Sequence, residues 1–283
     1  MLDLRHLETS LEHKPSVKTQ DSLLLQFKTL VDVVAKLRGP NGCPWDKEQT
    51  QRTLTRYAIE EAHELVEAIE SGDQKEIREE LGDFLFQVIL QAQVAEDEGQ
   101  FDLQQVIEVL NEKMIRRHPH VFSNVVAKTT DEVWKNWEKL KKQEKEKPVF
   151  SYPRTLPALQ AADKIGSKSK NYRFDWTRPD EVLEKIKEEL REVEEALRED
   201  DPKHLEHEIG DLLFSVAQLA RHKNLAPEQC LRVANRRFEN RFNQVLTLAE
   251  KLHGADAKTP EGFSQIPAVE KESLWAQAKK ILG

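Results

Sequence analysis

The sequence predicts an all-α protein built from two tandem helical-bundle domains. Apolar residues recur at spacings of three and four along most of the 283-residue chain, which places them on one face of a helix. The alternation of apolar and polar residues that marks a half-buried strand is nearly absent. The pattern of the first half also returns in the second half, which indicates that one helical unit is duplicated.

The composition is that of helical domains with well-solvated outer faces, since 33% of the residues are charged and 38% are hydrophobic. A formal net charge of -8 argues against stable binding to nucleic acid, which needs clustered Lys and Arg. The two cysteines, Cys43 and Cys230, form neither a disulfide framework nor a zinc motif, so we expect a reduced, cytoplasmic protein. No apolar stretch reaches the length of a signal peptide or of a membrane span, and no membrane association is expected.

The first domain is expected over residues 21–146, after a polar tail at 1–20. Its first helix stops at a turn that contains two glycines and two prolines, residues 39–44. One face of that helix is marked by apolar residues three and four apart, namely Leu23, Phe27, Leu30, Val34 and Leu37.

A second helix is predicted over roughly 50–70, ending at Ser71-Gly72, with an inward face of Ala58, Ala62, Leu65, Val66 and Ile69. Asp73 is expected to cap the next helix, which runs to about Gly99, with Glu76 as its capping-box partner. Further helices are predicted near 102–117 and 131–146.

A linker is predicted where three prolines and a run of charges interrupt the helical pattern, and we place it at 147–157. The second domain then covers 158–283. Helices are expected near 180–199, 202–223, 227–253 and 267–282, and Asp201 followed by Pro202 marks the start of the second of them.

The internal repeat is literal. Residues 80–88 and 208–216 agree at six of nine positions, at an offset of 128. At the same offset, the acidic residues of the segment 60–64 match those of 188–192. Since one offset joins both acidic segments, we infer the duplication of a unit of about 130 residues.

Each repeat carries four carboxylates at helical spacing. Glu61 and Glu64 share one helix face, Glu80 and Asp83 share a face of the next helix, and a short turn makes the two helices antiparallel neighbours. The matching residues of the second repeat are Glu189, Glu192, Glu208 and Asp211. Converging carboxylates repel one another unless a cation neutralises them, and hard oxygen ligands suit Mg²⁺. The set therefore predicts metal-assisted hydrolysis of a phosphoanhydride by a bound water.

Other interpretations of these residues stay open. A single acidic motif in so charged a protein is more often a solvated surface. Gly82 and Gly210, each inside a predicted helix, indicate close approach either by a ligand or by a packed helix. A di-iron bundle would need a second Glu-x-x-His, and Arg191 stands where the repeat would require it. His204 and His207 fit a surface pair better than a metal site.

Basic residues that can hold phosphate also recur in both repeats. Arg237 and Arg241 are four apart on a helix face, as are Lys113 and Arg117. Trp275 with Lys279 can stack a base and hold a phosphate, and Trp137 with Lys141 repeats that spacing. The alternatives are a solvated basic face and a Trp275 that only packs its helix. The glycine-rich signatures of other nucleotide sites are missing.

The motifs together resemble the MazG nucleotide pyrophosphohydrolases, a family of the all-α NTP pyrophosphatase superfamily, over roughly residues 22–283. The motifs that carry the resemblance are GCPWDKEQT at 42–50, EExxE at 60–64 and 188–192, ExGD at 80–83 and 208–211, RRHPHVF at 116–122, and FDW at 174–176.

This resemblance implies a dimeric helical enzyme that uses Mg²⁺ to convert nucleoside triphosphates to monophosphates and pyrophosphate, chiefly in the second domain. It implies Glu189, Glu192, Glu208 and Asp211 as catalytic metal ligands. It implies Lys185, Arg237, Arg241, Trp275 and Lys279 as substrate contacts, although the family more often has lysine where Arg237 stands. We add Glu188 and His207, which neighbour the acids, as candidate substrate contacts.

A homodimer has separate support, because residues 84–90 are apolar around most of a helix and need cover on several sides. Two other functions stay open. One is a nucleotide sensor or helical interaction module that binds without turnover. The other is an enzyme restricted to one nucleotide, such as dUTP or phosphoribosyl-ATP.

Overall fold

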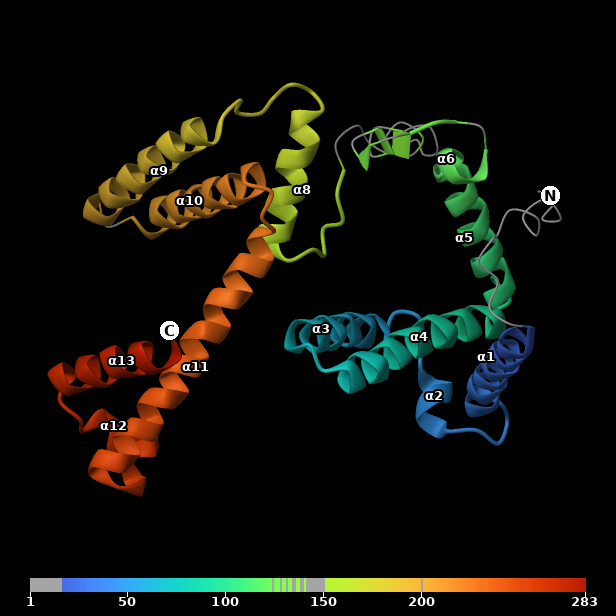
Figure 1. Ribbon diagram of the computed structural model, residues 1–283, viewed down its shortest axis with the longest axis horizontal. Helices are drawn as coiled ribbons and strands as arrows, with labels where there is room; N and C mark the ends of the chain where they lie inside the picture. The colour runs from blue at the N-terminus through green and yellow to red at the C-terminus, as the bar shows by residue number, and fades with distance from the viewer. Residues whose placement is uncertain are drawn as a thin grey trace. The chain divides into compact units, whose positions relative to one another are not determined.

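The chain forms two compact helical units, Met1–Glu146 (unit 1) and Lys147–Gly283 (unit 2) (Figure 1). The computed structural model describes residues 17–123, 151–199 and 201–283, together with 125–127, 129–130, 132–133, 136–137 and 140. Within these residues every regular element is a helix, which confirms the predicted fold class. None of the described helices is long and apolar enough to cross a membrane.

Unit 1 is organised around its longest helix, α4, against which α1, α3 and α5 pack (Figure 1). Its core consists of Leu54 and of buried residues from α1 and α4, among them Val34, Ile89, Leu90 and Val94. The helices are α1 (Val17–Arg38), α2 (Pro44–Glu48), α3 (Thr55–Ser71), α4 (Gln74–Asp97), α5 (Leu103–Arg117) and α6 (Pro119–Phe122).

The turn between α3 and α4 sets the two helices antiparallel. Gly72 takes the left-handed conformation, with φ 82°, and its N–H donates to the Ala68 carbonyl. Asp73 caps α4 as predicted, accepting from the N–H groups of Lys75 and Glu76. The capping-box prediction was wrong, because the Glu76 carboxylate accepts from the Ser71 hydroxyl and does not return to Asp73. Among the helices that the structure describes, a capping box is found at the start of α5 instead.

The predicted inward faces hold only in part. On α3 the buried position belongs to Ala68, while Ile69 is 56% exposed. The reason is that α3 packs mainly against α4, so only one narrow stripe of the helix is covered. On α1, Val34 is buried and Phe27 and Leu30 pack against the core, whereas Leu23 is exposed.

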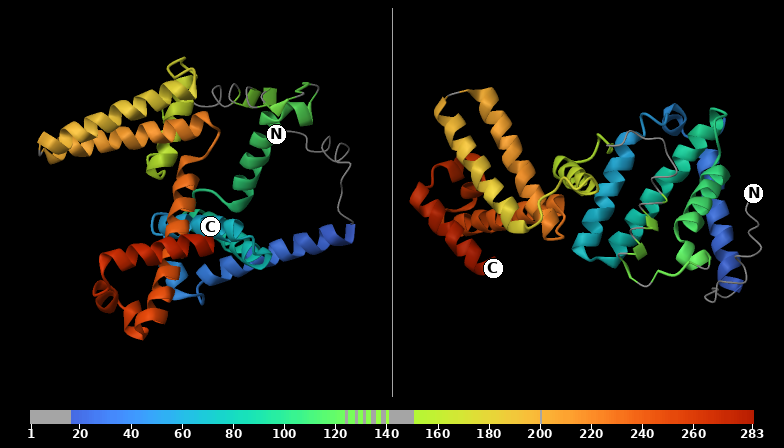
Figure 2. Two further views of the ribbon diagram at one scale, coloured as in Figure 1. Left: turned by 60° about the vertical axis from the view of Figure 1, so that its left-hand side comes forward. Right: turned by 90° about the horizontal axis from the view of Figure 1, so that it is seen from above.

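Unit 2 repeats the hairpin and adds a second pair of helices. The helix α10 packs against α9 and α8, while α11 packs against α13 and α8 (Figures 1 and 2). The core of the α11–α13 arm includes Val245, Ala249 and Leu274. The elements are α8 (Ala158–Lys170), α9 (Pro179–Glu199), α10 (Pro202–His222), α11 (Pro227–His253), the 3-10 helix η2 (Ala255–Lys258), α12 (Pro260–Ser264) and α13 (Ala268–Leu282).

The helix α8 was not predicted, and it positions the hairpin. At Gly166 an added Cβ would lie 1.8 Å from Oε1 of Gln218 on α10, so a larger residue would force the Gln218 side chain to shift. The Gln218 amide also donates to the Ala162 carbonyl, at 2.9 Å. Most of the helix predicted at 131–146, and residues 147–150 of the linker, lie outside the described residues.

Candidate metal centre

The antiparallel α9–α10 hairpin brings three carboxylates of unit 2 together. Asp201 caps α10 by accepting from the N–H groups of Lys203 and His204. Ligand atoms of Glu189, Glu192 and Glu208 then lie within 4.8 Å of one another, and we call these residues the unit 2 trio. Glu189 is 4% exposed and Glu208 is 7% exposed, so these two acids are not solvated surface charges.

Lys185 supplies a positive charge to this trio. Its Nζ lies 2.8 Å from Oε1 of Glu188 and 2.8 Å from Oε1 of Glu189. These hydrogen bonds, first to Glu188 and then to Glu189, raise the pKa of Lys185. The pKa of Glu192 is raised by its hydrogen bond with Glu189, then by desolvation and by the charges of Glu189 and Glu208. The acids repel one another, so this donor set fits a hard cation.

The two histidines of α10 contact the acids, which the surface-pair interpretation did not anticipate. His204 Nε2 lies 3.1 Å from Oε1 of Glu208, and His207 Nδ1 lies 3.3 Å from the same oxygen. His207 Nε2 is also 3.4 Å from Oδ2 of Asp211. Asp211 is thus grouped with His207 and Glu208, and not with Glu189 and Glu192.

Unit 1 forms a matching cluster on the α3–α4 hairpin. Ligand atoms of Glu61, Glu64 and Glu80 lie within 4.8 Å of one another, and we call these residues the unit 1 trio. Desolvation, followed by the charges of Asp83 and Glu64, raises the pKa of Glu61. Desolvation and the charge of Glu64 likewise raise the pKa of Glu80. Asp83 stands outside the trio but is near enough for its charge to act on both glutamates.

The two helical glycines between the acids have open surroundings. A Cβ built at Gly82 or at Gly210 would meet nothing within 4 Å. Close helix packing among the described residues therefore does not explain these glycines, and of the two interpretations offered by the sequence, approach by a ligand remains a prediction.

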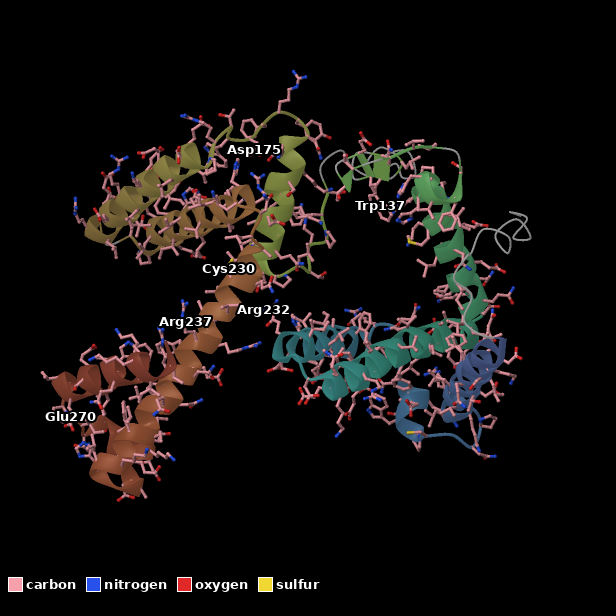
Figure 3. The ribbon with its side chains drawn as sticks, viewed as in Figure 1. Trp137, Asp175, Cys230, Arg232, Arg237 and Glu270 are labelled. Atoms are coloured by element: carbon pink, nitrogen blue, oxygen red, sulfur yellow. The ribbon has the colours of Figure 1, made fainter. Side chains whose placement is uncertain are left out.

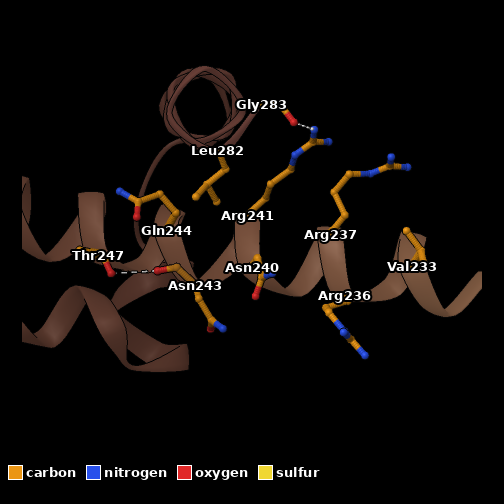
Figure 4. A pocket seen from close by; sticks show the side chains of 10 residues that line it. All are labelled: Val233, Arg236, Arg237, Asn240, Arg241, Asn243, Gln244, Thr247, Leu282 and Gly283. Atoms are coloured by element: carbon orange, nitrogen blue, oxygen red, sulfur yellow. Dashed lines mark hydrogen bonds between the residues drawn. The ribbon is translucent and has the colours of Figure 1, made fainter. Parts of the chain in front are cut away.

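The arginines of α11 line a cavity of about 560 Å³ beside the end of α13. Arg237 and Arg241 point to the same side of α11, while Arg236 points away from them (Figure 4). Arg241 Nη2 donates to the Gly283 carbonyl at 2.8 Å. The lining has no Asp or Glu side chain, and its arginines give it positive charge, part of which the Gly283 oxygen already engages through Arg241. It consists of Val233, Arg236, Arg237, Asn240, Arg241, Asn243, Gln244, Thr247, Leu282 and Gly283.

The tryptophans pack within their own units. The centres of the Trp275 and Phe238 rings are 5.2 Å apart, and Trp275 packs against the α11–α13 core. Lys279 is exposed. In unit 1 the Arg117 guanidinium lies 5.0 Å from the centre of the Trp137 ring. Lys113 is half-buried on α5, and Lys141 lies outside the described residues.

A buried ion pair, which sequence reasoning missed, holds the loop before α9. Asp175 lies in the loop between α8 and α9 (Figure 3). Arg221 on α10 donates from Nη1 to Oδ2 of Asp175 at 3.0 Å and from Nη2 to Oδ1 at 2.5 Å. His222 Nε2 lies 3.1 Å from the same Asp175. Burial raises the pKa of Asp175, but hydrogen bonds from Arg221 and His222 outweigh it and hold that pKa below its usual range. The FDW motif, which contains Asp175, was the available signal.

The fold and these clusters define a class of protein: a tandem all-α protein with a carboxylate trio on one helical hairpin of each unit. The MazG nucleotide pyrophosphohydrolase domain matches residues 49–122 and again residues 177–246, so that each match spans one trio. The chain therefore belongs to the MazG nucleotide pyrophosphohydrolase family.

Similar proteins extend over most of the chain. A nucleoside triphosphate pyrophosphohydrolase/pyrophosphatase MazG of Thermotoga maritima is 43% identical over 257 residues, which are 89% of this chain and 95% of that protein. A nucleoside triphosphate pyrophosphohydrolase of Escherichia coli K12 is 39% identical over 267 residues, 90% of this chain and 97% of that protein. The uncharacterized protein YabN of Bacillus subtilis is 40% identical over 271 residues, which cover 94% of this chain and 54% of YabN.

Proposed function

We propose that this protein hydrolyses nucleoside triphosphates, both NTPs and dNTPs with broad specificity, to the monophosphate and pyrophosphate. The observation that carries the proposal is the unit 2 trio on the α9–α10 hairpin, with Lys185 beside it. The printed names of the Thermotoga and Escherichia relatives support the same activity. We assign the reaction chiefly to the second domain, taken as residues 158–283, because only there does a lysine accompany the trio among the described residues.

We further propose that Glu189, Glu192, Glu208 and Asp211 hold Mg²⁺. When bound, this ion would polarise the phosphates and lower the pKa of the attacking water. Lys185 and the pair Arg237 and Arg241 would bind the phosphate oxygens, since fixed cations stabilise charge on a transferring phosphoryl group. Glu188, 2.8 Å from Lys185, and His207, 3.4 Å from Asp211, would be further substrate contacts beside these residues.

The base contacts and the assembly are also proposals. Trp275 and Lys279 would contact the nucleotide from the exposed side of α13. A homodimer would cover apolar residues that the single chain leaves exposed on the acid-bearing helices, among them Leu81, Leu85 and Val88 on α4 and Leu190 and Leu213 on the α9–α10 hairpin. A cytoplasmic location agrees with the two free cysteines, Cys43 and Cys230.

The first test is to incubate the protein with Mg²⁺ and each common NTP and dNTP and to identify the products. Monophosphate with pyrophosphate is expected. Diphosphate with orthophosphate would contradict the proposed cleavage between the α and β phosphates. Binding without any turnover would favour the nucleotide-sensing module, and turnover of a single nucleotide would favour a specialised enzyme.

The second test compares matched substitutions in the two units. Glu192→Ala and Asp211→Ala are expected to abolish pyrophosphate release while the helical circular dichroism is kept. The controls Glu64→Ala and Asp83→Ala change the equivalent acids of unit 1. Unchanged turnover in both unit 2 variants would contradict the assignment to the second domain.

A further inference from the structure

The two carboxylate trios differ in the positive charges around them. In unit 2, Lys185 lies 2.8 Å from Glu189, and His204 lies 3.1 Å from Glu208. At the repeat offset, these two partners are replaced in unit 1 by Tyr57 and Glu76. Within the part of the chain that the structure describes, no Lys, Arg or His forms an ion pair with Glu61, Glu64 or Glu80. Among the described residues, the unit 1 trio therefore lacks the basic neighbours that the unit 2 trio has.

A second observation at the unit 1 trio points to a ligand. Gln87 is 6% exposed, and its Nε2 lies 3.4 Å from Oε1 of Glu61, so the amide faces the trio. Its other end, Oε1, is buried and accepts no hydrogen bond. Oε2 of Glu80 is buried and unpartnered in the same way. Buried polar atoms without partners are costly, and two acceptors at one acid cluster require donors or a cation.

A hydrated divalent cation meets both requirements. Its charge would offset the repulsion among the three carboxylates. Mg²⁺ usually keeps several of its waters when a protein binds it, and those waters donate hydrogen bonds. Such waters are donors of the kind that the unpartnered oxygens of Gln87 and Glu80 lack. The corresponding residue in unit 2 is Ser215, which has no amide oxygen to offer.

We propose that the unit 1 trio binds a divalent cation in the absence of nucleotide, whereas the unit 2 trio binds the ion weakly until a nucleotide is present. In unit 2, Lys185 already pairs with the Glu189 carboxylate, so the free protein neutralises part of that trio and a cation has to compete with the lysine for this carboxylate. In unit 1 no such competitor acts on the described trio. The proposal goes beyond turnover, since it concerns the nucleotide-free protein.

The test is calorimetric titration of the full-length, nucleotide-free protein with MgCl₂, repeated with Mn²⁺ and read by electron paramagnetic resonance. We expect one site at least tenfold tighter than the other. Glu64→Gln should abolish the tight site, and Glu192→Gln should leave it in place. Gln87→Ser, which installs the unit 2 residue, should weaken it several-fold.

A lysine pair completes the experiment. Lys185→Met should tighten the weak site severalfold, whereas the control Lys187→Met, which removes an exposed partner of Glu184, should change neither site. Loss of the tight site in Glu192→Gln but not in Glu64→Gln would overturn the proposal, as would two sites of equal affinity. Circular dichroism checks that each variant folds. Product formation is measured separately, so a failure of the proposed enzyme activity is a distinct result.

Discussion

Removal of the buried guanidinium of Arg221 is expected to destabilise unit 2 more than any exposed ion pair of that unit. The Arg221 and Asp175 side chains are each 8% exposed, and two hydrogen bonds join them. Arg221 also donates from Nε to Gln218, at 2.7 Å. The substitution Arg221→Met keeps much of the apolar stem but leaves the Asp175 carboxylate buried with only His222 beside it.

The magnitude follows from burial. Breaking a buried pair by removing one partner costs about 3 to 5 kcal/mol, because an uncompensated charge remains. Since His222 still contacts Asp175, we expect the lower value, about 3 kcal/mol. At roughly 3 °C per kcal/mol, that loss lowers the melting temperature by about 9 °C. The matched control is Arg178→Met, because Arg178 is 70% exposed in its pair with Glu181 and should contribute less than about 1 kcal/mol.

The assay is urea unfolding monitored by hydrogen exchange in peptides from α8 and α10. These peptides belong to unit 2, so the exchange reports on that unit alone. A loss from Arg221→Met no larger than that from Arg178→Met would refute the reasoning. A double variant, Asp175→Leu with Arg221→Met, should recover much of the loss since no charge is left unpaired. The folded-state pKa of Asp175 is lowered, so the stabilisation is complete above its ordinary pKa and is lost as the pH falls towards the folded value.

Three further results are expected. Hydrogen bonds, the first of them from the Thr177 N–H, lower the pKa of Glu181 to about 2. The stability of the fold should therefore fall as the pH decreases from the ordinary pKa near 4.5 to about 2. Glu181→Gln should remove this pH dependence, which an acid titration monitored by circular dichroism measures. Gly166→Ala should cost about 1 to 3 kcal/mol in urea unfolding because Gln218 blocks the new Cβ, whereas Gly210→Ala should stabilise its helix by up to about 1 kcal/mol; an equal effect of both would contradict this. Arg237→Lys keeps the charge, so KM and kcat for a nucleoside triphosphate should change little if Arg237 holds a phosphate mainly through that charge, whereas a marked rise in KM would show that the fork geometry is needed.

The helices were predictable because residues close together in the sequence determine where each helix begins and ends. Asp73 and Asp201 cap α4 and α10, and the sequence identified both as capping residues. Four converging acids were predicted in each repeat, and three of them meet, because helical spacing places residues three apart on one face and a short turn brings the two faces together. Asp83 and Asp211 stand outside the trios. Local rules of this kind apply without knowing which helices pack against one another.

The contacts that distinguish the two units were not predictable in the same way. The approach of Gln87 to Glu61, and that of Arg221 to Asp175, depend on how far each helix is rotated about its axis. That rotation is set by packing across helices, which sequence periodicity does not resolve. The exposure of Ile69 has the same origin, because α3 has a partner along only one stripe.

The duplication makes the difference between the two sites interpretable, because the hairpin geometry is common to both. Each trio places three carboxylates within 4.8 Å, so the repulsion to be offset is of the same kind. What differs is the compensation, which is a lysine in unit 2 and unpartnered oxygens of Gln87 and Glu80 in unit 1. A cation that binds in unit 2 competes with Lys185 for the Glu189 carboxylate, and a nucleotide can accept that lysine through its phosphates. Ion and nucleotide binding should therefore be coupled in unit 2 and independent in unit 1, even though both sites use the same helical hairpin.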